Sequence, residues 1–390
     1  MRQAWPVLAC LLTLSSIPRS AKADDVAWWL TVSGERRELF RGASVDPRGV
    51  CLVGHVEVAP KSYDSFVIRL DTALRQRWKA TVGGAKNDKL YGVVGTRDGG
   101  CLAVGSTESS GAGLQDGWVV RLDAKGKRLW QKTFGGAKHD VLFDVVAFGG
   151  DFIAVGATSS KGAGAWDGWA LRLSGAGLAK WEKTYGGKDF DGLFSVVSTK
   201  DGFVAAGGTW SKGAGKEDFW VLRAKRDGSL RWDKTYGGTA TEEAKRIVAL
   251  SDGDFVVTGG TYSKGAGQED IWVLRLRGDG SRVWDKTFGG KGWDGAWALA
   301  PAKGGGVVVV GWTKSFGAGR ADIWLIRLDR AGKELWKRLY GTTGTEMVFA
   351  AVALPKGRTL IAGYWEQRGA LLDAVVMIVD DKGRRVEKKK

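Results

Sequence analysis

Short apolar runs alternate with glycine-rich polar turns along almost the whole chain. Residues 192–238, for example, divide into GLFSVVS, TKDG, FVAAGGTW, SKGAGKED, FWVLRAK, RDGS and LRWDKTYGG. Runs rich in Val, Phe, Trp and Leu that are bounded by Gly and Asp-Gly signals predict β-strands joined by tight turns. This segment therefore predicts four strands, and no stretch after residue 24 shows a sustained helical period.

The same four-strand pattern is present in seven copies. Each copy begins with a variant of Trp-x-Lys-Thr-aromatic-Gly-Gly, and its Trp recurs every 50 to 52 residues, at Trp28, Trp78, Trp130, Trp181, Trp232, Trp284 and Trp336. Ten residues after each Trp lies an acid, which is Glu38, Asp88, Asp140, Asp191, Glu242, Asp294 or Glu346. A second acid recurs at Asp64, Asp116, Asp167, Asp218, Asp270, Asp322 and Asp373. A supersecondary unit repeated at a fixed period indicates a stacked or circular repeat architecture.

The two ends of the chain favour the circular arrangement. The first Trp strand, Trp28 to Val32, has no preceding partner, whereas the last copy has Glu387 where an eighth Trp is due. The N-terminal strand can complete the last unit and so remove an exposed sheet edge. We therefore predict an all-β protein, a seven-bladed β-propeller of four-stranded antiparallel blades over residues 24–390, closed by the N-terminal strand and followed by a short basic tail.

The repeat motifs also carry a family resemblance. The patterns W-x-K-T-[FY]-G-G-x-x-x-D, D-G-G, S-x-G-A-G-x-x-D-x-W and L-D-x-x-G resemble those of bacterial and archaeal secreted β-propeller repeat proteins, and residues 122–130 resemble the quinoprotein-type blade motif. The resemblance implies the fold but not an activity, because propellers serve as scaffolds, lectins, lyases and dehydrogenases. Quinone-dependent members have calcium ligands, a vicinal disulfide and usually eight blades. This chain has no Cys-Cys pair and seven repeats, so we expect no cofactor.

Composition excludes several classes of protein. With 60 Gly but 6 Pro, and 44% hydrophobic residues, the chain is neither collagen-like nor disordered. Two His and three Cys leave little for a histidine metal centre, a disulfide scaffold or a four-thiolate zinc site, so we expect no metal. Cys51 and Cys101 occupy near-equivalent inner positions of repeats 1 and 2, where we expect buried free thiols.

The N-terminus and the charge suggest where the protein acts. Residues 1–23 have an early Arg2, an apolar run and Ala21-Lys22-Ala23, which predicts a signal peptide and an exported, periplasmic or extracellular protein. Cleavage before Asp24 removes three bases and no acid, which lowers the net charge from +16 to +13. Bases crowd the predicted hairpin turns, for example DAKGKR. They predict either a solvated surface or a basic face that contacts an anionic polymer or a membrane surface without reading a nucleic-acid sequence.

Recurrence helps to separate structural residues from functional ones, because a single functional site must break the sevenfold pattern. We expect the first set of acids, Glu38 to Glu346, to form a ring at one mouth of the central channel. We prefer the interpretation in which each carboxylate caps its own turn. In the alternative interpretation the carboxylates together hold a cation. Six arginines follow the second acids by five residues, and we expect them to pair with acids between blades: Arg69, Arg121, Arg172, Arg223, Arg275 and Arg327.

Positions that vary between repeats are the candidates for ligand contact. Three residues after each ring acid stand Arg41, Tyr91, Phe143, Phe194, Lys245, Trp297 and Phe349. One residue later, Asp144 and Arg246 replace the small residues of most other copies. From these two positions we select Arg41, Asp144, Lys245, Arg246 and Trp297. Irregular loops in repeats 1 and 7 add an asymmetric sector of five further candidates, which are His55, Tyr63, Tyr364, Trp365 and Arg368.

No catalytic constellation is evident, so the sequence predicts a monomeric binding or scaffold propeller that docks a protein or glycan partner on its loop face. One alternative is a polysaccharide lyase or hydrolase, in which Asp144, Lys245 or Arg246 meets a second acid or base in one pocket. Another is a multivalent lectin with equivalent aromatic pockets that involve Trp210 and Tyr262.

Overall fold

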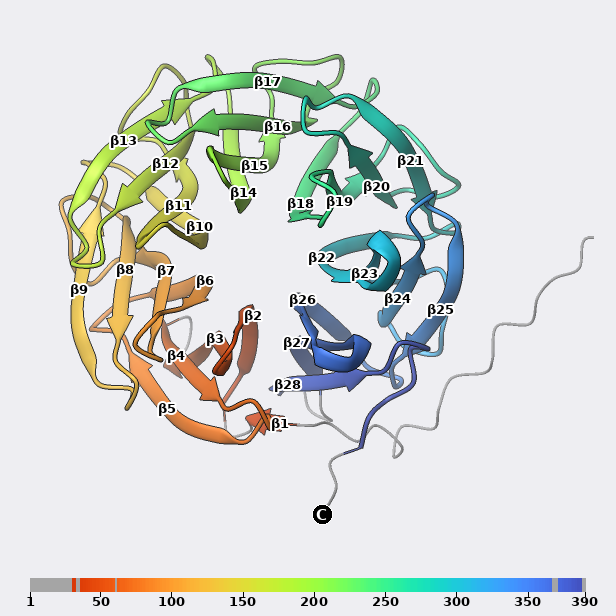
Figure 1. The fold of residues 1–390 in the computed structure, drawn as a ribbon, viewed down its shortest axis with the longest axis horizontal. Helices are drawn as coiled ribbons and strands as arrows, with labels where there is room; N and C mark the ends of the chain where they lie inside the picture. The colour runs from red at the N-terminus through yellow and green to blue at the C-terminus, as the bar shows by residue number, and fades with distance from the viewer. Residues whose placement is uncertain (1–29, 33–35, 60–61, 367–370, 388–390) are drawn as a thin grey trace, which may run out of the picture.

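The chain forms a closed ring of seven antiparallel sheets around a central axis (Figure 1). The computed structural model describes residues 30–32, 36–59, 62–366 and 371–387. Within these residues each sheet has four strands, and the prediction of a seven-bladed β-propeller is confirmed. The proposed signal peptide, residues 1–23, lies outside the described residues. Within the described part of the chain, no helix has the length and apolarity needed to cross a bilayer.

The strands follow the predicted repeat, with the first strand of each blade nearest the axis (Figure 1). Blades 1 to 3 contain β2 (Glu38–Asp46), β3 (Gly49–Ala59), β4 (Ser62–Leu70), β5 (Gln76–Val82), β6 (Asp88–Gly95), β7 (Cys101–Thr107), β8 (Asp116–Leu122), β9 (Arg128–Phe134), β10 (Asp140–Phe148), β11 (Asp151–Thr158), β12 (Asp167–Leu173) and β13 (Ala179–Tyr185). Blades 4 and 5 contain β14 (Asp191–Thr199), β15 (Gly202–Thr209), β16 (Asp218–Lys225), β17 (Leu230–Tyr236), β18 (Glu242–Ala249), β19 (Phe255–Thr261), β20 (Asp270–Leu276) and β21 (Arg282–Phe288). Blade 6 contains β22 (Asp294–Ala302), β23 (Gly306–Thr313), β24 (Asp322–Leu328) and β25 (Glu334–Tyr340), with the 3₁₀ turn η2 (Lys303–Gly305).

The last blade is completed from the other end of the chain, as the sequence predicts. Its strands are β26 (Glu346–Leu354), β27 (Arg358–Glu366), β28 (Leu372–Val379) and β1 (Leu30–Val32), with the 3₁₀ turn η3 (Pro355–Gly357). β1 pairs antiparallel with β28, and Leu30 lies opposite Val376. The ring is therefore latched by hydrogen bonds between the first and last strands of the chain.

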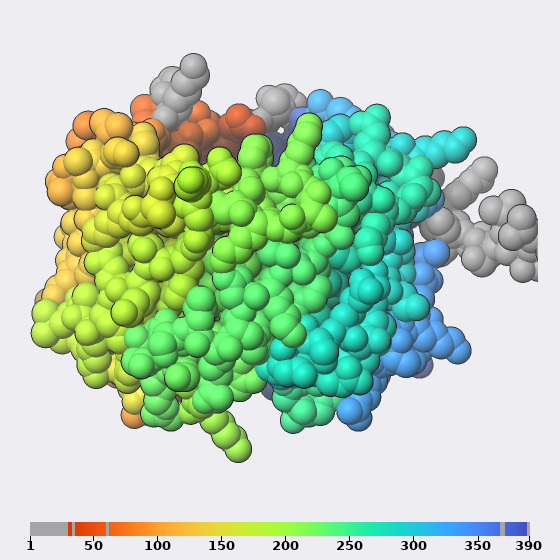
Figure 2. All heavy atoms as spheres, turned by 90° about the horizontal axis from the view of Figure 1, so that it is seen from above, coloured from red at the N-terminus to blue at the C-terminus, as the bar shows by residue number. Residues whose placement is uncertain are grey.

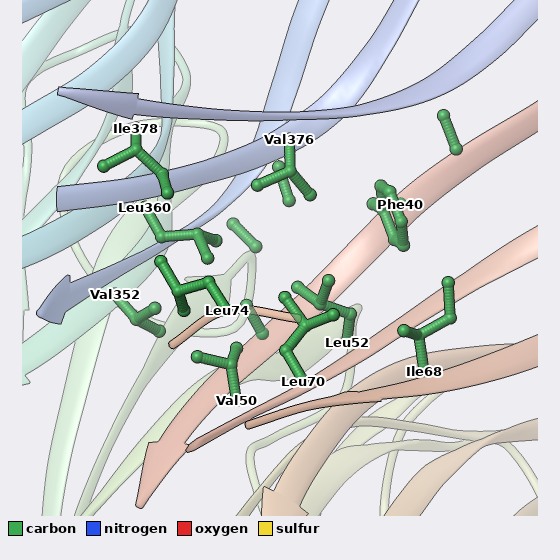
Figure 3. Packing of buried hydrophobic residues seen from close by; sticks show 14 of the residues in the cluster. Phe40, Val50, Leu52, Ile68, Leu70, Leu74, Val352, Leu360, Val376 and Ile378 are labelled. Atoms are coloured by element: carbon green, nitrogen blue, oxygen red, sulfur yellow. The ribbon is translucent and has the colours of Figure 1, made fainter. Parts of the chain in front are cut away.

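Apolar side chains fill the spaces between the blades. Among the described residues, seven buried clusters occur, and each lies between two neighbouring blades. The cluster at the closing boundary places Leu52 and Ile68 of blade 1 beside Leu360 and Val376 of blade 7 (Figure 3). Viewed from the side of the ring, successive blades pack against one another in chain order (Figure 2). Both faces of a blade pack against neighbouring blades, so the second and third strands are buried along their whole length, as in β7 and β8, and read as continuous apolar runs.

The recurring Trp and Arg residues hold neighbouring blades together at the outer hairpin turns. Indole Nε1 atoms of the outer strands donate to carbonyl oxygens in the turn of the next blade over 2.9–3.1 Å, from Trp78, Trp181, Trp232, Trp284 and Trp336. Three of the recurring arginines, Arg172, Arg223 and Arg275, likewise donate to a carbonyl oxygen in the outer turn of the next blade. The predicted pairing of the arginines with acids between blades is wrong, because five of the six bind an acid in the inner hairpin turn of their own blade. Arg69, for example, lies 2.8 Å from Asp46, while Arg327 instead donates to the carbonyl oxygen of Lys303.

The expectation of free thiols is also wrong, because Cys51 and Cys101 form a disulfide between blades 1 and 2. Their separation of 50 residues differs by one from the local repeat, since Gly54 and Gly105 occupy equivalent places opposite Phe40 and Leu90. Because side chains alternate along a strand, this offset of one residue turns Cys51 toward blade 2 and Cys101 toward blade 1. The two sulfurs meet in the apolar cluster between these blades.

Candidate functional site

A β-bulge occurs at the same place in the inner strand of every blade. The pairing of each inner strand with its neighbour skips the residue three positions after the ring acid, for example Phe143 between Leu142 and Asp144. The skipped residues are Arg41, Tyr91, Phe143, Phe194, Lys245, Trp297 and Phe349. A bulge bends the strand and re-aims the extra side chain. The variable position that the sequence singles out is therefore the bulge position of the propeller.

These seven side chains form a continuous belt around the axis. Each ring or cation contacts the belt residue of the next blade, with separations between 4.3 and 6.0 Å. The Arg41 guanidinium lies 4.3 Å from the centre of the Phe349 ring, and the Lys245 ammonium lies 4.9 Å from that of Trp297. Cations are attracted to the negative faces of aromatic rings, so the two basic members fit between aromatic neighbours. The belt is closed through all seven blades.

A cavity of about 380 Å³ lies at the centre of the belt. All seven belt residues line it, together with Phe190, Glu243 and Arg246. Its volume is within the range of small-ligand sites, which is ~300–1,000 Å³. The lining combines aromatic faces with a small number of charged groups, and this is the usual character of a ligand site.

Two of the three cations in this cavity have an acidic partner. The Lys245 ammonium pairs with the carboxylate of Glu243 at the rim. The Arg246 guanidinium lies 3.1 Å from Asp144, which is only 4% exposed and also accepts hydrogen bonds from the Ser195 hydroxyl and backbone amides. Asp144 and Arg246 thus lie within hydrogen-bond reach although they belong to blades 3 and 5. The enzyme alternative also requires that both groups share one pocket, and Asp144 lies outside the cavity lining, where its carboxylate holds Arg246 in place.

Arg41 differs from the other two cations. Among the described residues no carboxylate forms an ion pair with it, and its Nε is buried without a hydrogen-bond partner. Burial lowers the pKa of Arg41, but a guanidinium stays protonated in proteins, so the site keeps a positive charge. The Arg41 side chain is only partly buried and lines the cavity, where its contacts are the aromatic rings of Phe349 and Tyr91. It is therefore the cation of the lining that is not already paired with a carboxylate of the described residues.

The predicted asymmetric sector lies partly behind the belt. The His55 ring is 5.4 Å from that of Tyr91, and its Nε2 donates to the carbonyl oxygen of Leu90 over 2.7 Å. Burial and the charge of Arg41 lower the pKa of His55 to about 3, so the imidazole is neutral near pH 7. Tyr364 supports the belt in a similar way, with its ring 6.0 Å from Phe349.

Two further members of that sector, Tyr63 and Trp365, lie outside the lining of the central cavity. The Tyr63 ring stacks under the Lys89 ammonium at 4.5 Å, and Trp365 lies in β27 opposite Glu346. Arg368 lies outside the described residues. The structure thus brings Arg41, Lys245, Arg246 and Trp297 together in one cavity and places His55 and Tyr364 directly behind its wall.

The seven ring acids are buried and lie outside the cavity lining. Asp191 shows the common arrangement, in which the carboxylate accepts from the Gly187 amide and the Ser211 hydroxyl, both at 2.7 Å, and from Thr209. The Gly-Gly pairs allow this contact, because a Cβ on Gly135 would lie 2.4 Å from an Asp140 oxygen. Burial raises the pKa of Glu38 and Glu346. Within the described residues no cluster of three or more potential metal-ligating side chains occurs.

Sequence reasoning missed Glu217 and Glu269, which lie directly before the second acids of blades 4 and 5. Glu217 is 7% exposed, and burial together with the neighbouring Glu243 carboxylate raises its pKa to about 7. Burial also raises the pKa of Glu269, which accepts a hydrogen bond from the Tyr262 hydroxyl. The sequence signal is present in SKGAGKED and SKGAGQED, where two acids are adjacent.

The surface aromatics are not repeated around the ring. Trp210 is 51% exposed and Tyr262 is 43% exposed, on blades 4 and 5. The equivalent loop positions of other blades hold Glu108, Ser159 and Lys314. The set of equivalent aromatic pockets expected for a multivalent lectin is therefore absent at this position of the described residues.

Comparisons with known proteins identify the fold and not a family. No family model and no curated protein matches this chain. The WD40 domain of Neurospora crassa Pan2 is similar with a TM-score of 0.51 and 10% identity over 90% of this chain and 91% of that one. The Pyrococcus horikoshii acylaminoacyl peptidase is similar with a TM-score of 0.50 and 10% identity over 90% of this chain and 52% of the peptidase. This chain therefore spans about half of that enzyme. A putative 6-phosphogluconolactonase from Bacteroides uniformis has a TM-score of 0.49 and 12% identity over 90% of this chain and 99% of that one. At 10% identity the likeness to the WD40 domain and to the peptidase shows the propeller fold alone.

Proposed function

We propose that this protein is a non-catalytic binding module that docks a protein or glycan partner on the face that carries the long loops, with a group of the partner inserted into the belt cavity. The observation that carries the proposal is the set of seven bulges, which direct side chains of different types into one cavity of about 380 Å³. A fold requirement explains the repeated bulge, whereas variation in the residue at that bulge is expected of a ligand site.

Two features support a role outside the cytoplasm. Residues 1–23 have the pattern of a signal peptide, and the Cys51–Cys101 disulfide suits an oxidising compartment. Secretion of a reporter fused to residues 1–23, and its retention after Leu11→Arg, is the expected result. Export that does not depend on this segment contradicts the proposal.

The binding role is tested with a printed array of oligosaccharides and peptides. We expect the protein to retain at least one class of probe, and the double variant Trp297→Ala/Phe349→Ala to lose it, because these two rings form one wall of the cavity. Leu129→Ala on the outer wall is the matched control, since this exposed side chain lies far from the belt in blade 2. Equal retention by the belt variant, or no retained probe, overturns the proposal.

One observation favours the enzyme alternative. The pKa of Glu217, near 7 beside Glu243, suits a carboxylic acid that donates a proton to a leaving group. A polysaccharide-acting enzyme predicts new chain ends when the protein is incubated with an acidic polysaccharide, and their loss in Glu217→Gln. Binding without new chain ends supports the module without turnover.

A further inference from the structure

The mouth of the channel carries opposite charges on two arcs. On the arc of blades 1 and 2, Arg41 and Lys89 are close enough for the charge of Arg41 to add to burial in lowering the pKa of Lys89. The other titratable groups that face Arg41 are the phenols of Tyr91 and Tyr364 and the neutral imidazole of His55. On the arc of blades 4 and 5, the carboxylates of Glu217 and Glu269 both interact with Glu243. Of these three carboxylates only Glu243 lines the cavity, so an occupant meets Arg41 on one side and Glu243, Lys245 and Arg246 of blade 5 on the other.

The cationic side is built to receive a planar anion. The Arg41 Cζ lies 4.3 Å from the centre of the Phe349 ring, and the side chain lines the cavity. A guanidinium held over an aromatic ring can donate from its terminal NH groups to the two oxygens of a carboxylate. The basic charge of the chain, +13 after the predicted cleavage, also favours an anionic ligand.

The remaining lining suits a ligand that has both apolar faces and hydroxyl groups. Aromatic rings surround the cavity, and the CH face of a sugar ring stacks on such surfaces because their π-faces are negative. Glu243 can accept hydrogen bonds from sugar hydroxyls, and Lys245 and Arg246 can donate to them. A purely apolar group would instead remove these three charged side chains from water without replacement.

Resting on the binding role above, we propose that the belt cavity takes a hexuronate residue of an acidic glycan, with the sugar ring between the aromatic side chains and its carboxylate on Arg41. The hydroxyl side of the sugar then faces Glu243 and Lys245. The chain of the glycan leaves over blades 4 and 5, where Trp210 and Tyr262 are exposed. This assigns a ligand class to the site that the binding role leaves open.

Isothermal titration with a trigalacturonate tests the assignment. Its methyl-ester form and maltotriose serve as neutral probes, and benzoate serves as a carboxylate without a sugar. We expect wild-type protein to bind the trigalacturonate and Arg41→Gln to weaken that binding by about tenfold or more, because a charge-assisted bidentate contact is lost. Arg41→Lys should restore part of the affinity. Lys127→Gln in an exposed turn on the opposite face removes the same charge and is the matched control. Unchanged thermal unfolding of each variant shows that it is folded.

Several results overturn the assignment and leave the binding role standing. Equal affinity for the ester and the acid, or an Arg41→Gln variant as tight as wild type, removes Arg41 as the carboxylate site. Benzoate or an acidic peptide bound more tightly than the trigalacturonate removes the sugar. In each of these cases, binding that still depends on Trp297 and Phe349 keeps the cavity as the binding site. Loss of that dependence contradicts the binding role itself.

Discussion

The ring acids and the belt lie three residues apart on the same seven inner strands, yet they differ in every other respect. The acids are always Asp or Glu, are buried, and bind the amides and hydroxyls of their own blade. The belt positions vary between Arg, Lys and aromatic residues, and they share one cavity. A residue type that recurs answers a demand of the fold, whereas a position that recurs with different residues is available for a ligand.

Loss of a ring acid should have the largest effect on stability. We expect Asp191→Ala to lower the free energy of unfolding by about 3 kcal/mol or more, because the Gly187 amide and two hydroxyls lose their buried acceptor. The belt variant Phe194→Leu, three residues away, should cost less than about 1.5 kcal/mol. Urea unfolding of both variants measures the difference. Equal losses of unfolding free energy in the two variants would remove the distinction between the ring acids and the belt.

The boundary of blades 1 and 2 should be the next most sensitive. Removing the disulfide with Cys51→Ala/Cys101→Ala should cost ~2–4 kcal/mol, because the cross-link limits the unfolded chain and its sulfurs fill the cluster between the blades. Unfolding with and without reductant checks this. Wild-type protein should shift with reductant, and the double variant should not. A reductant effect that persists in the variant contradicts the assignment.

The acidic arc should make stability depend on pH. Because the folded state raises the pKa of Glu217 to about 7, it holds a proton that the unfolded chain releases near its ordinary value of 4.5. Stability is therefore highest below pH 4.5 for this group and falls as the pH rises toward 7, by about 2–3 kcal/mol. The slope of melting temperature between pH 5 and 8 should be smaller in Glu217→Gln. Glu334→Gln, on an outer strand, should keep the wild-type slope.

Replacement of Arg41 should change the free energy of unfolding least, and it should stabilise the protein instead of destabilising it. We expect Arg41→Met to raise the free energy of unfolding by up to about 1 kcal/mol, because the variant no longer buries an Nε without a hydrogen-bond partner and retains an apolar side chain against Phe349. Thermal unfolding measures the change. Destabilisation comparable to that of Asp191→Ala would place Arg41 with the structural residues.

Much of the architecture could be predicted because the fold makes the same demand seven times. The Trp spacing predicts the blades, and the missing eighth Trp predicts that β1 closes the ring against β28. The bulge position could also be selected from the sequence, since it is the place where residue types vary. Whether those side chains meet depends on the bulge itself, which no local sequence signal specifies.

Other features depend on register and distance, which a repeat alignment does not contain. Cys51 and Cys101 look equivalent until a shift of one residue puts them on facing sides of two blades. Arg246 could be recognised as an unusual residue, but its partner Asp144 is two blades away. Glu217 has no counterpart in most repeats, and its altered proton affinity arises from burial and from Glu243.

The two cations in the belt remove the sevenfold symmetry of the propeller at its axis. Arg41 and Lys245, on blades 1 and 5, divide the remaining belt into one arc of three rings and another of two. No rotation by a whole number of blades superimposes this pattern on itself. A ligand bound at the axis therefore has a single preferred orientation about that axis. A polymer attached to it would leave the propeller in one fixed radial direction.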